Sequence, residues 1–232
     1  MLILPLGTQR ETQKRVPFLT LLVCVTCIVV HVLVTKEATK LAYAFAPHTM
    51  NVGHMITAAF LHASWSHLIG NLFFFFCFAS TIEREITAKG YIALFLLFAV
   101  ITHLSFALLT KVYLPTLGLS GVVWGFMGLF LARFPFEKVD CFIWFLWKMR
   151  MVGVPALLFV LGYLFMDVAA LRRNAPGVNH LAHLSGFMAG MMLIGFGSML
   201  ERTTAPRRVR RQASPSRNTT IAAPPVPDHD WR

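Results

Sequence analysis

The sequence of 232 residues predicts an all-α, polytopic membrane protein with six transmembrane helices and a long interfacial outer loop between the first two helices. Two features of the composition indicate this class. Hydrophobic residues other than Gly make up 56% of the chain, against about 45–50% with Gly included in a soluble domain. Charged residues make up 13%, about half of the usual quarter. These values exclude a disordered chain, a soluble acidic enzyme and a typical nucleic-acid-binding protein.

The hydrophobic residues gather in six runs. A bilayer core of about 30 Å needs about 20 apolar helical residues. The runs cover residues 17–34, 65–82, 91–110, 119–132, 152–171 and 181–200. We therefore expect a cytoplasmic N-terminal segment (1–16) without a signal-peptide pattern, a six-helix membrane domain (17–200) and a C-terminal tail (201–232).

The Lys and Arg residues between the runs predict the orientation in the membrane. With both termini cytoplasmic, 16 of the 21 Lys and Arg lie inside and five lie outside. The tail combines five Pro and the basic run at 207–211 with almost no large apolar residues. We expect it to be disordered and to lie against anionic lipids, with no nucleic acid involved. The predicted location is a bacterial cytoplasmic membrane.

Two loops carry apolar residues. The outer loop, residues 36–64, contains Phe45, Met50, Met55, Ile56 and Phe60 among others and is expected to lie partly in the membrane interface. The inner loop, residues 136–150, carries four aromatic residues between basic ones, a pattern typical of the headgroup level. Cys24 and Cys27 have C-x-x-C spacing inside an apolar run, where small apolar side chains are expected rather than a disulfide.

Polar groups inside membrane spans are costly, so each of them is a functional candidate. The candidates are His67, Asn71, His103, Ser120, Asp167, His180 and His183. For Asp167 we expect pairing with Arg172 or Arg173, or a place in a cavity wall, and a third catalytic carboxylate stays open. His103 and His180 are expected to be packing histidines.

The predicted topology places His67, Ser120 and His183 at a similar depth near the outer leaflet, because each lies near the start of an inward-running span. The fourth span is short, so Ser120 would lie about 8–10 Å below the outer surface. The loop at 112–118 must then enter the protein. Irregular backbone at that depth is tolerated only inside protein or beside water, which predicts a wet cavity above Ser120.

Small residues line the fourth and sixth spans. The fourth span carries four glycines around and after Ser120, namely Gly118, Gly121, Gly125 and Gly128. The sixth span carries small residues on both sides of His183, namely Ala182, Gly186 and Gly190. Such stripes let helix backbones approach closely. Close packing would bring the hydroxyl and the imidazole within the roughly 2.6–3.2 Å that proton transfer needs.

Together these features resemble the rhomboid family of intramembrane serine proteases, over about residues 4–200. The matching pieces, in chain order, are residues 4–7 (LPLG), 60–71 (FLHxxWxHxxxN), Glu83, 118–121 (GxSG) and 182–190 (AHxxGxxxG). A lone G-x-S-G is a weak signal, but five pieces in order are a strong one. The chain departs from the family in lacking a Trp-Arg pair in the outer loop.

The resemblance implies roles for these residues. Ser120 would be the nucleophile and His183 the general base, in a dyad without a carboxylate. His67, Asn71 and the Ser120 backbone N–H would form the oxyanion hole. Trp124 would stack on the His183 ring, His62 would support the outer loop, and Gly118, Gly121, Gly186 and Gly190 would support the site.

The resemblance also implies transmembrane protein substrates cut near their outer end, a lateral gate at the fifth span, and no metal or other cofactor. Asp167 falls where some relatives carry Gln. The sequence does not indicate an oligomeric state.

Four other functions fit the sequence less well. A metalloprotease lacks support because the chain has no H-E-x-x-H motif and His180 and His183 have no acidic residue near them in the sequence. An aspartyl intramembrane protease needs two membrane Asp residues, and only Asp167 qualifies. A transporter should show internal repeats, which are not found. A catalytically inactive rhomboid-like protein that binds membrane clients remains the alternative, although Ser120 and His183 are both present.

Overall fold

A computed structural model of the chain describes residues 2–9, 15–110, 114–145, 148–173, 175 and 177–196. The expected disordered tail at 201–232 lies outside the described residues. The described part is mainly helical, which confirms the helical class that the sequence predicts.

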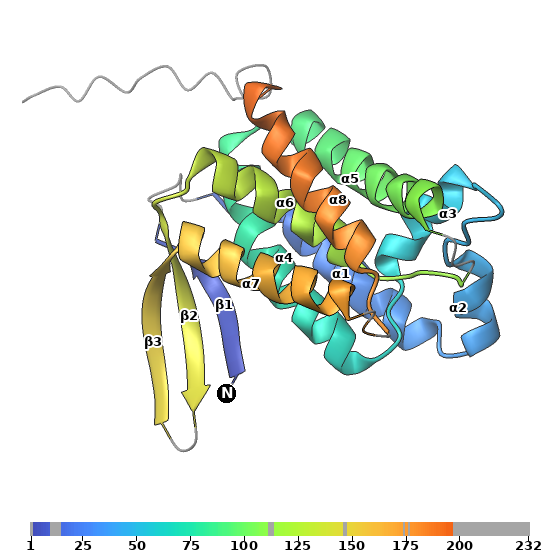
Figure 1. Cartoon of the computed structure of the whole chain (residues 1–232), viewed down its shortest axis with the longest axis horizontal. Coiled ribbons are helices and arrows are strands. Elements are labelled where there is room, and N and C mark those ends of the chain that lie inside the picture. Colours follow the sequence, from blue (N-terminus) through green and yellow to red (C-terminus); the bar gives the residue numbers. More distant parts are fainter. Residues whose placement is uncertain are drawn as a thin grey trace, which may run out of the picture. The chain divides into compact units, whose positions relative to one another are not determined.

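Six longer helices occupy the six hydrophobic runs (Figure 1). They are α1 (Phe18–Leu33), α4 (Trp65–Glu85), α5 (Ala88–Leu109), α6 (Ser120–Arg133), α7 (Ala156–Arg172) and α8 (His180–Met192), the last continued by the 3-10 turn η2 (Leu193–Phe196). By length and hydropathy α4 and α5 could each cross a membrane, and α1 and α6 are apolar but shorter. The chain is thus consistent with a membrane protein.

The loop between α1 and α4 is itself folded. It contains the short helices α2 (Glu37–Tyr43) and α3 (Val52–Thr57) and the 3-10 turn η1 (Ala58–Phe60). Phe45, Met55 and Ala58 are buried together with Phe106 of α5. The loop therefore packs through an apolar cluster of its own on one end of the helical domain.

A three-stranded antiparallel sheet corrects the all-α prediction. Its strands are β1 (Leu2–Thr8), β2 (Lys138–Phe145) and β3 (Lys148–Pro155), in the order β1-β2-β3. Leu4 pairs with Phe142, and Val139 pairs with Val154. Aromatic and β-branched residues suit strands, but the partner of β1 lies more than a hundred residues along the chain. The local pattern therefore predicted only aromatics at the headgroup level.

The sheet also shifts the start of one predicted helix. Residues 152–155 complete β3, so α7 begins at Ala156 rather than at residue 152, directly after Pro155. Strand β1 leads into α1, β2 follows α6 and β3 leads into α7. All three strands therefore lie at the same end of the helices (Figure 1).

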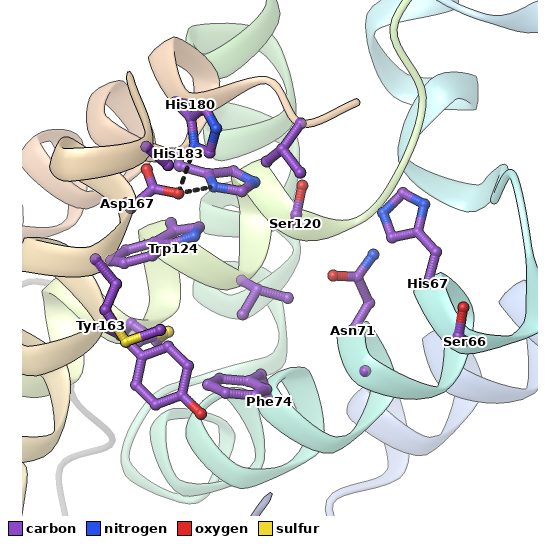
Figure 2. Close-up of a pocket in the computed structure, with 16 residues that line it drawn as sticks. Ser66, His67, Asn71, Phe74, Ser120, Trp124, Tyr163, Asp167, His180 and His183 are labelled. Atoms are coloured by element: carbon purple, nitrogen blue, oxygen red, sulfur yellow. Dashed lines mark hydrogen bonds and ion pairs between the residues drawn. The ribbon is translucent and has the colours of Figure 1, made fainter. Parts of the chain in front are cut away.

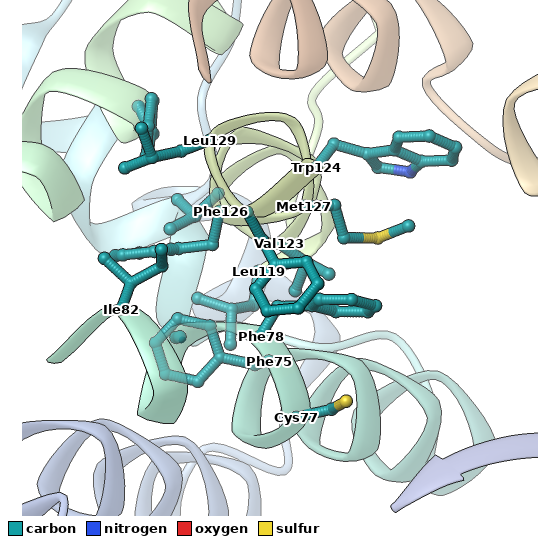
Figure 3. Close-up of a cluster of buried hydrophobic side chains, with 14 of the residues drawn as sticks. Phe75, Cys77, Phe78, Ile82, Leu119, Val123, Trp124, Phe126, Met127 and Leu129 are labelled. Carbon is teal, nitrogen blue, oxygen red and sulfur yellow. The ribbon is translucent and has the colours of Figure 1, made fainter. Parts of the chain in front are cut away.

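Helix α6 is the centre of the core (Figure 3). Every residue from 121 to 131 is buried. The Phe126 ring lies 5.7 Å from Phe75, 5.2 Å from Tyr91 and 5.3 Å from Phe98, measured between ring centroids. A helix that is buried on all sides fixes the position of whatever its first residue carries, and that residue is Ser120.

The contact between α6 and α8 depends on glycines. A Cβ atom on Gly186 would overlap the carbonyl oxygen of Gly121, and one on Gly190 would overlap that of Gly125. A Cβ on Gly128 would likewise overlap the carbonyl oxygen of Phe187. The close packing expected from the two small-residue stripes is therefore present.

A buried carboxylate joins α1 to α4. Glu83 accepts hydrogen bonds from the backbone N–H groups of Leu19 and Thr20, at 2.9 and 2.8 Å, and from the Thr20 hydroxyl at 2.7 Å. The Thr20 hydroxyl also lies 2.9 Å from the hydroxyl of Tyr91. The first N–H groups of a helix have no partner within the helix and favour an anion. The Glu83 carboxylate supplies both the hydrogen-bond acceptor and the negative charge, so it holds the start of α1 in place.

Gly190→Ala should destabilise the fold, because the added methyl group would overlap the Gly125 carbonyl oxygen. Overpacking of this kind costs about 1–3 kcal/mol of unfolding free energy. The matched control is Gly162→Ala in α7, where a Cβ meets no atom within 4 Å. It should be neutral or stabilising by up to about 1 kcal/mol through helix propensity. Thermal unfolding in detergent, followed by circular dichroism, compares them, and equal midpoints would contradict the close contact.

Candidate active site

Four helices enclose a pocket of about 400 Å³ (Figure 2). It is lined by the N-terminal turns of α4, α6 and α8 and by the C-terminal half of α7. The lining includes Ser120, His183, His67 and Asn71. The structure thus brings together the four side chains that the sequence predicts for the site. The pocket also matches the cavity expected above Ser120.

Ser120 is the first residue of α6 and follows a segment that enters the protein, as expected. Thr116 exchanges backbone hydrogen bonds with Phe45 of the outer loop at 3.0 and 2.8 Å, and the Gly118 N–H donates to the Ala58 carbonyl at 2.8 Å. Gly118 has φ of +126°, and a Cβ there would come within 2.8 Å of the His67 ring. Only glycine suits this turn, which aims the Ser120 side chain into the pocket (Figure 2).

His183 faces Ser120 from the second turn of α8 (Figure 2). The Trp124 indole stacks on its ring, with centroids 5.6 Å apart and planes 27° apart, as the sequence predicts. The Nε2 atom of His183 is buried and has no hydrogen-bond partner among the described residues, so no bond to Ser120 is present. Catalytic hydrogen bonds are often long before substrate binds and tighten in the complex.

Asp167 corrects two expectations. Its Oδ1 atom accepts hydrogen bonds from Nδ1 of His180 at 2.8 Å and from Nδ1 of His183 at 2.9 Å. Its partners are therefore these histidines and not Arg172 or Arg173, although it does line the cavity as expected. His180 is not simply a packing residue, and His183 does contact a carboxylate.

The sequence could have indicated that Asp167 needs a polar partner, but not which residues that partner would be. A carboxylate in an apolar helix requires a partner, and two histidines begin the next helix. Nothing in the spacing shows which face of α7 meets α8. His103, by contrast, is the packing histidine that was expected: its Nδ1 lies 2.8 Å from the Ala99 carbonyl oxygen, and its ring packs on Phe45.

His67 and Asn71 approach from α4, across the pocket (Figure 2). Their spacing of four residues puts both on one helix face. The Nδ2 atom of Asn71 is buried without a hydrogen-bond partner among the described residues, so it can donate a hydrogen bond to a group bound in the pocket. A buried polar group of this kind points to a ligand or an unfilled role.

The His62 side chain packs against the His67 ring. Its ring meets the His67 ring edge-on, with centroids 5.2 Å apart. Burial, with a smaller contribution from His67, lowers the pKa of His62 to about 3. His62 therefore stays neutral near pH 7 and acts as a packing group.

The remaining wall is apolar and was not predicted. Phe74, Met127, Tyr163 and Met166 form much of it. No sequence signal separates these residues from others that face lipid or core. The four cysteines, Cys24, Cys27, Cys77 and Cys141, are free thiols, away from this pocket's lining.

The groups are suited to acyl transfer. A hydroxyl faces an imidazole whose other nitrogen is held by a carboxylate, and an amide donor lies across the pocket. This is the arrangement of a nucleophile, a base with an orienting group, and an oxyanion donor. Within the described residues, Asp167, His180 and His183 also bring three possible metal-ligand atoms within 4.8 Å of one another.

Comparison with known proteins agrees with this description. The Rhomboid domain family model matches residues 49–199. The chain is 27% identical over 174 residues to "Rhomboid-like protein 11, chloroplastic" of Arabidopsis thaliana, covering 68% of this chain and 57% of that protein. It is 27% identical over 154 residues to "Presenilin-associated rhomboid-like protein A, mitochondrial" of Danio rerio, covering 63% and 38%.

The chain thus spans between about two fifths and three fifths of the length of these relatives. The family match covers α3 to α8 and includes every pocket residue named above. The protein therefore belongs to the rhomboid family of membrane-embedded proteins.

Proposed function

We propose that this protein is an intramembrane serine endopeptidase that cleaves transmembrane segments of membrane proteins near the outer leaflet. The observation that carries the proposal is the hydrogen bond between Asp167 and Nδ1 of His183. It places the ring proton on Nδ1 and leaves the Nε2 lone pair facing Ser120. That is the tautomer a general base requires.

The reaction follows from this arrangement. The Ser120 Oγ attacks the scissile carbonyl carbon while its proton passes to Nε2 of His183. The oxyanion that forms is bound by Asn71 Nδ2, a His67 ring N–H and the Ser120 backbone N–H, which has no partner within α6. His183 then gives its proton to the amine as the C–N bond breaks. A water entering the pocket hydrolyses the acyl-enzyme by the same steps.

Asp167 adds a positioning group to the dyad that the resemblance implies. The carboxylate fixes the ring orientation of His183 and stabilises the imidazolium that forms when Ser120 loses its proton. Trp124 restricts the same ring from its face. The base is thus held by one hydrogen bond and one stacking contact, so little reorganisation is needed during the reaction.

The strand pairing supports the proposed topology, with six spans and both termini inside. Strand β1 precedes α1 and β2 follows α6, and the two strands pair. They therefore lie on the same side of the membrane. The four helices α1, α4, α5 and α6 lie between them in the chain, and an even number of crossings returns the chain to its starting side.

This topology puts the sheet inside and the pocket near the outer leaflet, with the outer loop in the interface beside it. We accordingly propose residues 1–16 as cytoplasmic and residues 17–200 as the membrane domain. Three expectations stay predictions: a disordered tail at 201–232, contact of this tail with anionic lipids, and a location in a bacterial cytoplasmic membrane.

Substrates would enter past α7. Leu158, Leu161 and Phe165 of this helix are exposed apolar residues, suited to lipid or to a transmembrane segment. The pocket-facing side of α7 carries Tyr163 and Asp167. A substrate segment beside α7 would therefore reach the hydroxyl of Ser120 from the membrane.

An inactive rhomboid-like protein that binds membrane clients is the second candidate. The relatives are named rhomboid-like, which is compatible with either function. Such a protein has no need for a free, oriented base beside a hydroxyl. The Asp167–His183 hydrogen bond therefore favours the enzyme.

Labelling with a fluorophosphonate probe tests the nucleophile. We expect the purified full chain to be labelled and Ser120→Ala to be unlabelled. His183→Ala should be labelled about 10²–10⁴-fold more slowly, the usual contribution of a general base. No labelling of the folded wild type would favour the inactive protein, and labelling of Ser120→Ala would remove Ser120 as the nucleophile.

Replacing Asp167 tests the positioning role. In Asp167→Asn the amide can offer an N–H to Nδ1 and so favour the wrong tautomer. We expect the labelling rate to fall about 10²–10⁴-fold, within the range of a lost general base. Asp167→Glu should recover part of the rate, and the control Phe165→Leu on the outer face of α7 should keep it. An unfolding midpoint that falls with the rate would point to a structural role instead.

The oxyanion donor is tested by Asn71→Ala. Loss of one such donor typically lowers kcat by about 10²–10³-fold, and we expect the labelling rate to fall similarly. Ile69→Ala, at an exposed position on the same helix, is the control. A labelling rate within about threefold of wild type in Asn71→Ala would exclude Asn71 from the oxyanion hole.

A further inference from the structure

The Asp167 cluster, made of Asp167, His180 and His183, holds more than the proposed reaction uses. Only the Asp167–His183 bond is needed to orient the base. His180 nevertheless turns its Nδ1 to the same carboxylate oxygen, at 2.8 Å. The two imidazole rings are nearly perpendicular, at 88°, with centroids 6.0 Å apart. Three potential ligand atoms from two helices thus converge on one point.

Two imidazole nitrogens and a carboxylate oxygen form a ligand set for Zn²⁺ and similar ions. Tetrahedral ligands at about 2.0–2.2 Å from a zinc ion lie about 3.3–3.5 Å apart. The two nitrogens lie 2.8 and 2.9 Å from Asp167 Oδ1. An ion would therefore need each N–O separation to lengthen by about 0.5 Å, and all three ligand atoms already lie within 4.8 Å of one another.

The cluster also has a path to solvent. All three residues line the 400 Å³ pocket. Their side chains are 9–11% exposed, enough for a metal ion to reach them but not for the groups to be fully solvated. A fourth coordination position facing the pocket can be filled by water, as in zinc sites with three protein ligands.

Metal binding would change the protons on His183. In the metal-free site Nδ1 carries the proton and Nε2 has the free lone pair. A metal ion at Nδ1 needs the lone pair there, so the proton moves to Nε2. No proton leaves the ring, but Nε2 now donates and cannot accept the proton of Ser120.

We propose that Asp167, His180 and His183 form a binding site for a divalent transition-metal ion such as Zn²⁺. When bound, this ion reversibly inactivates the protein. The second half of this inference rests on the proposed protease function. The first half, binding, does not. The ion is an inhibitor that competes with the active tautomer of His183 and takes no part in the reaction.

Co²⁺ binding tests the site directly, since tetrahedral Co²⁺ gives intense visible absorption. The sample is the full chain in detergent, without an affinity tag that contains histidine. We expect wild type and Ser120→Ala to bind one Co²⁺ with these bands, displaced by Zn²⁺. His180→Asn should lose at least about 100-fold in affinity, because a ligand is gone. Absence of the bands in wild type, or equal affinity in His180→Asn, would overturn the site.

Inhibition is tested on the same proteins with the fluorophosphonate probe. In His180→Asn the introduced amide occupies the place of the imidazole Nδ1 and can still donate to Asp167, so labelling in metal-free buffer should stay within about threefold of wild type. Zn²⁺ should abolish labelling of wild type, with recovery on adding a chelator, and should spare His180→Asn. Equal inhibition of both proteins would place the inhibitory ion elsewhere, for example on the exposed His48.

The two proposals fail in different ways. If wild type is not labelled in metal-free buffer, the protease function fails, while Co²⁺ binding by Ser120→Ala still decides the metal site. If labelling is present but neither Co²⁺ nor Zn²⁺ binds at the Asp167 cluster, the metal inference fails and the protease function stands.

Discussion

The close contact between α6 and α8 is the constraint on which the site depends. Gly186 and Gly190 leave no Cβ where the carbonyl oxygens of Gly121 and Gly125 pass. The backbones can therefore approach until the first turn of α6 faces the second turn of α8. A larger residue at either glycine would move His183 away from Ser120, and neither side chain is long enough to close the gap. Packing, rather than a direct bond, sets their separation.

A second constraint is that polar groups in an apolar interior need partners. Glu83 meets it with the unpaired N–H groups at the start of α1. Asp167 meets it with two imidazole rings. The outcomes differ because of location. Glu83 lies away from the pocket and only joins helices, whereas Asp167 faces the pocket and contacts Nδ1 of His183.

The sequence predicted those parts of the molecule that depend on local pattern. The six hydrophobic runs are long and apolar, so their helices were placed to within about four residues, and spaced glycines indicated the α6–α8 contact. The end of the sixth helix is the exception, because α8 stops at Met192 and residues 197–200 lie outside the described part. The β1–β2 pairing could not be predicted, because its register depends on residues more than a hundred positions apart. Asp167 was found as a candidate, but its partners depend on how α7 is rotated against α8, which no spacing within either helix reveals.

The carboxylate has two consequences that cannot be separated. One oxygen of Asp167 accepts from both His180 and His183, so whatever fixes the base also gathers two imidazoles around an anion. A neutral amide at this position could orient one ring but would be a poor metal ligand. Under the two proposals, Asp167 would both orient the base and complete a ligand set for a divalent ion. Orientation of the base and sensitivity to metal would then follow from the same side chain.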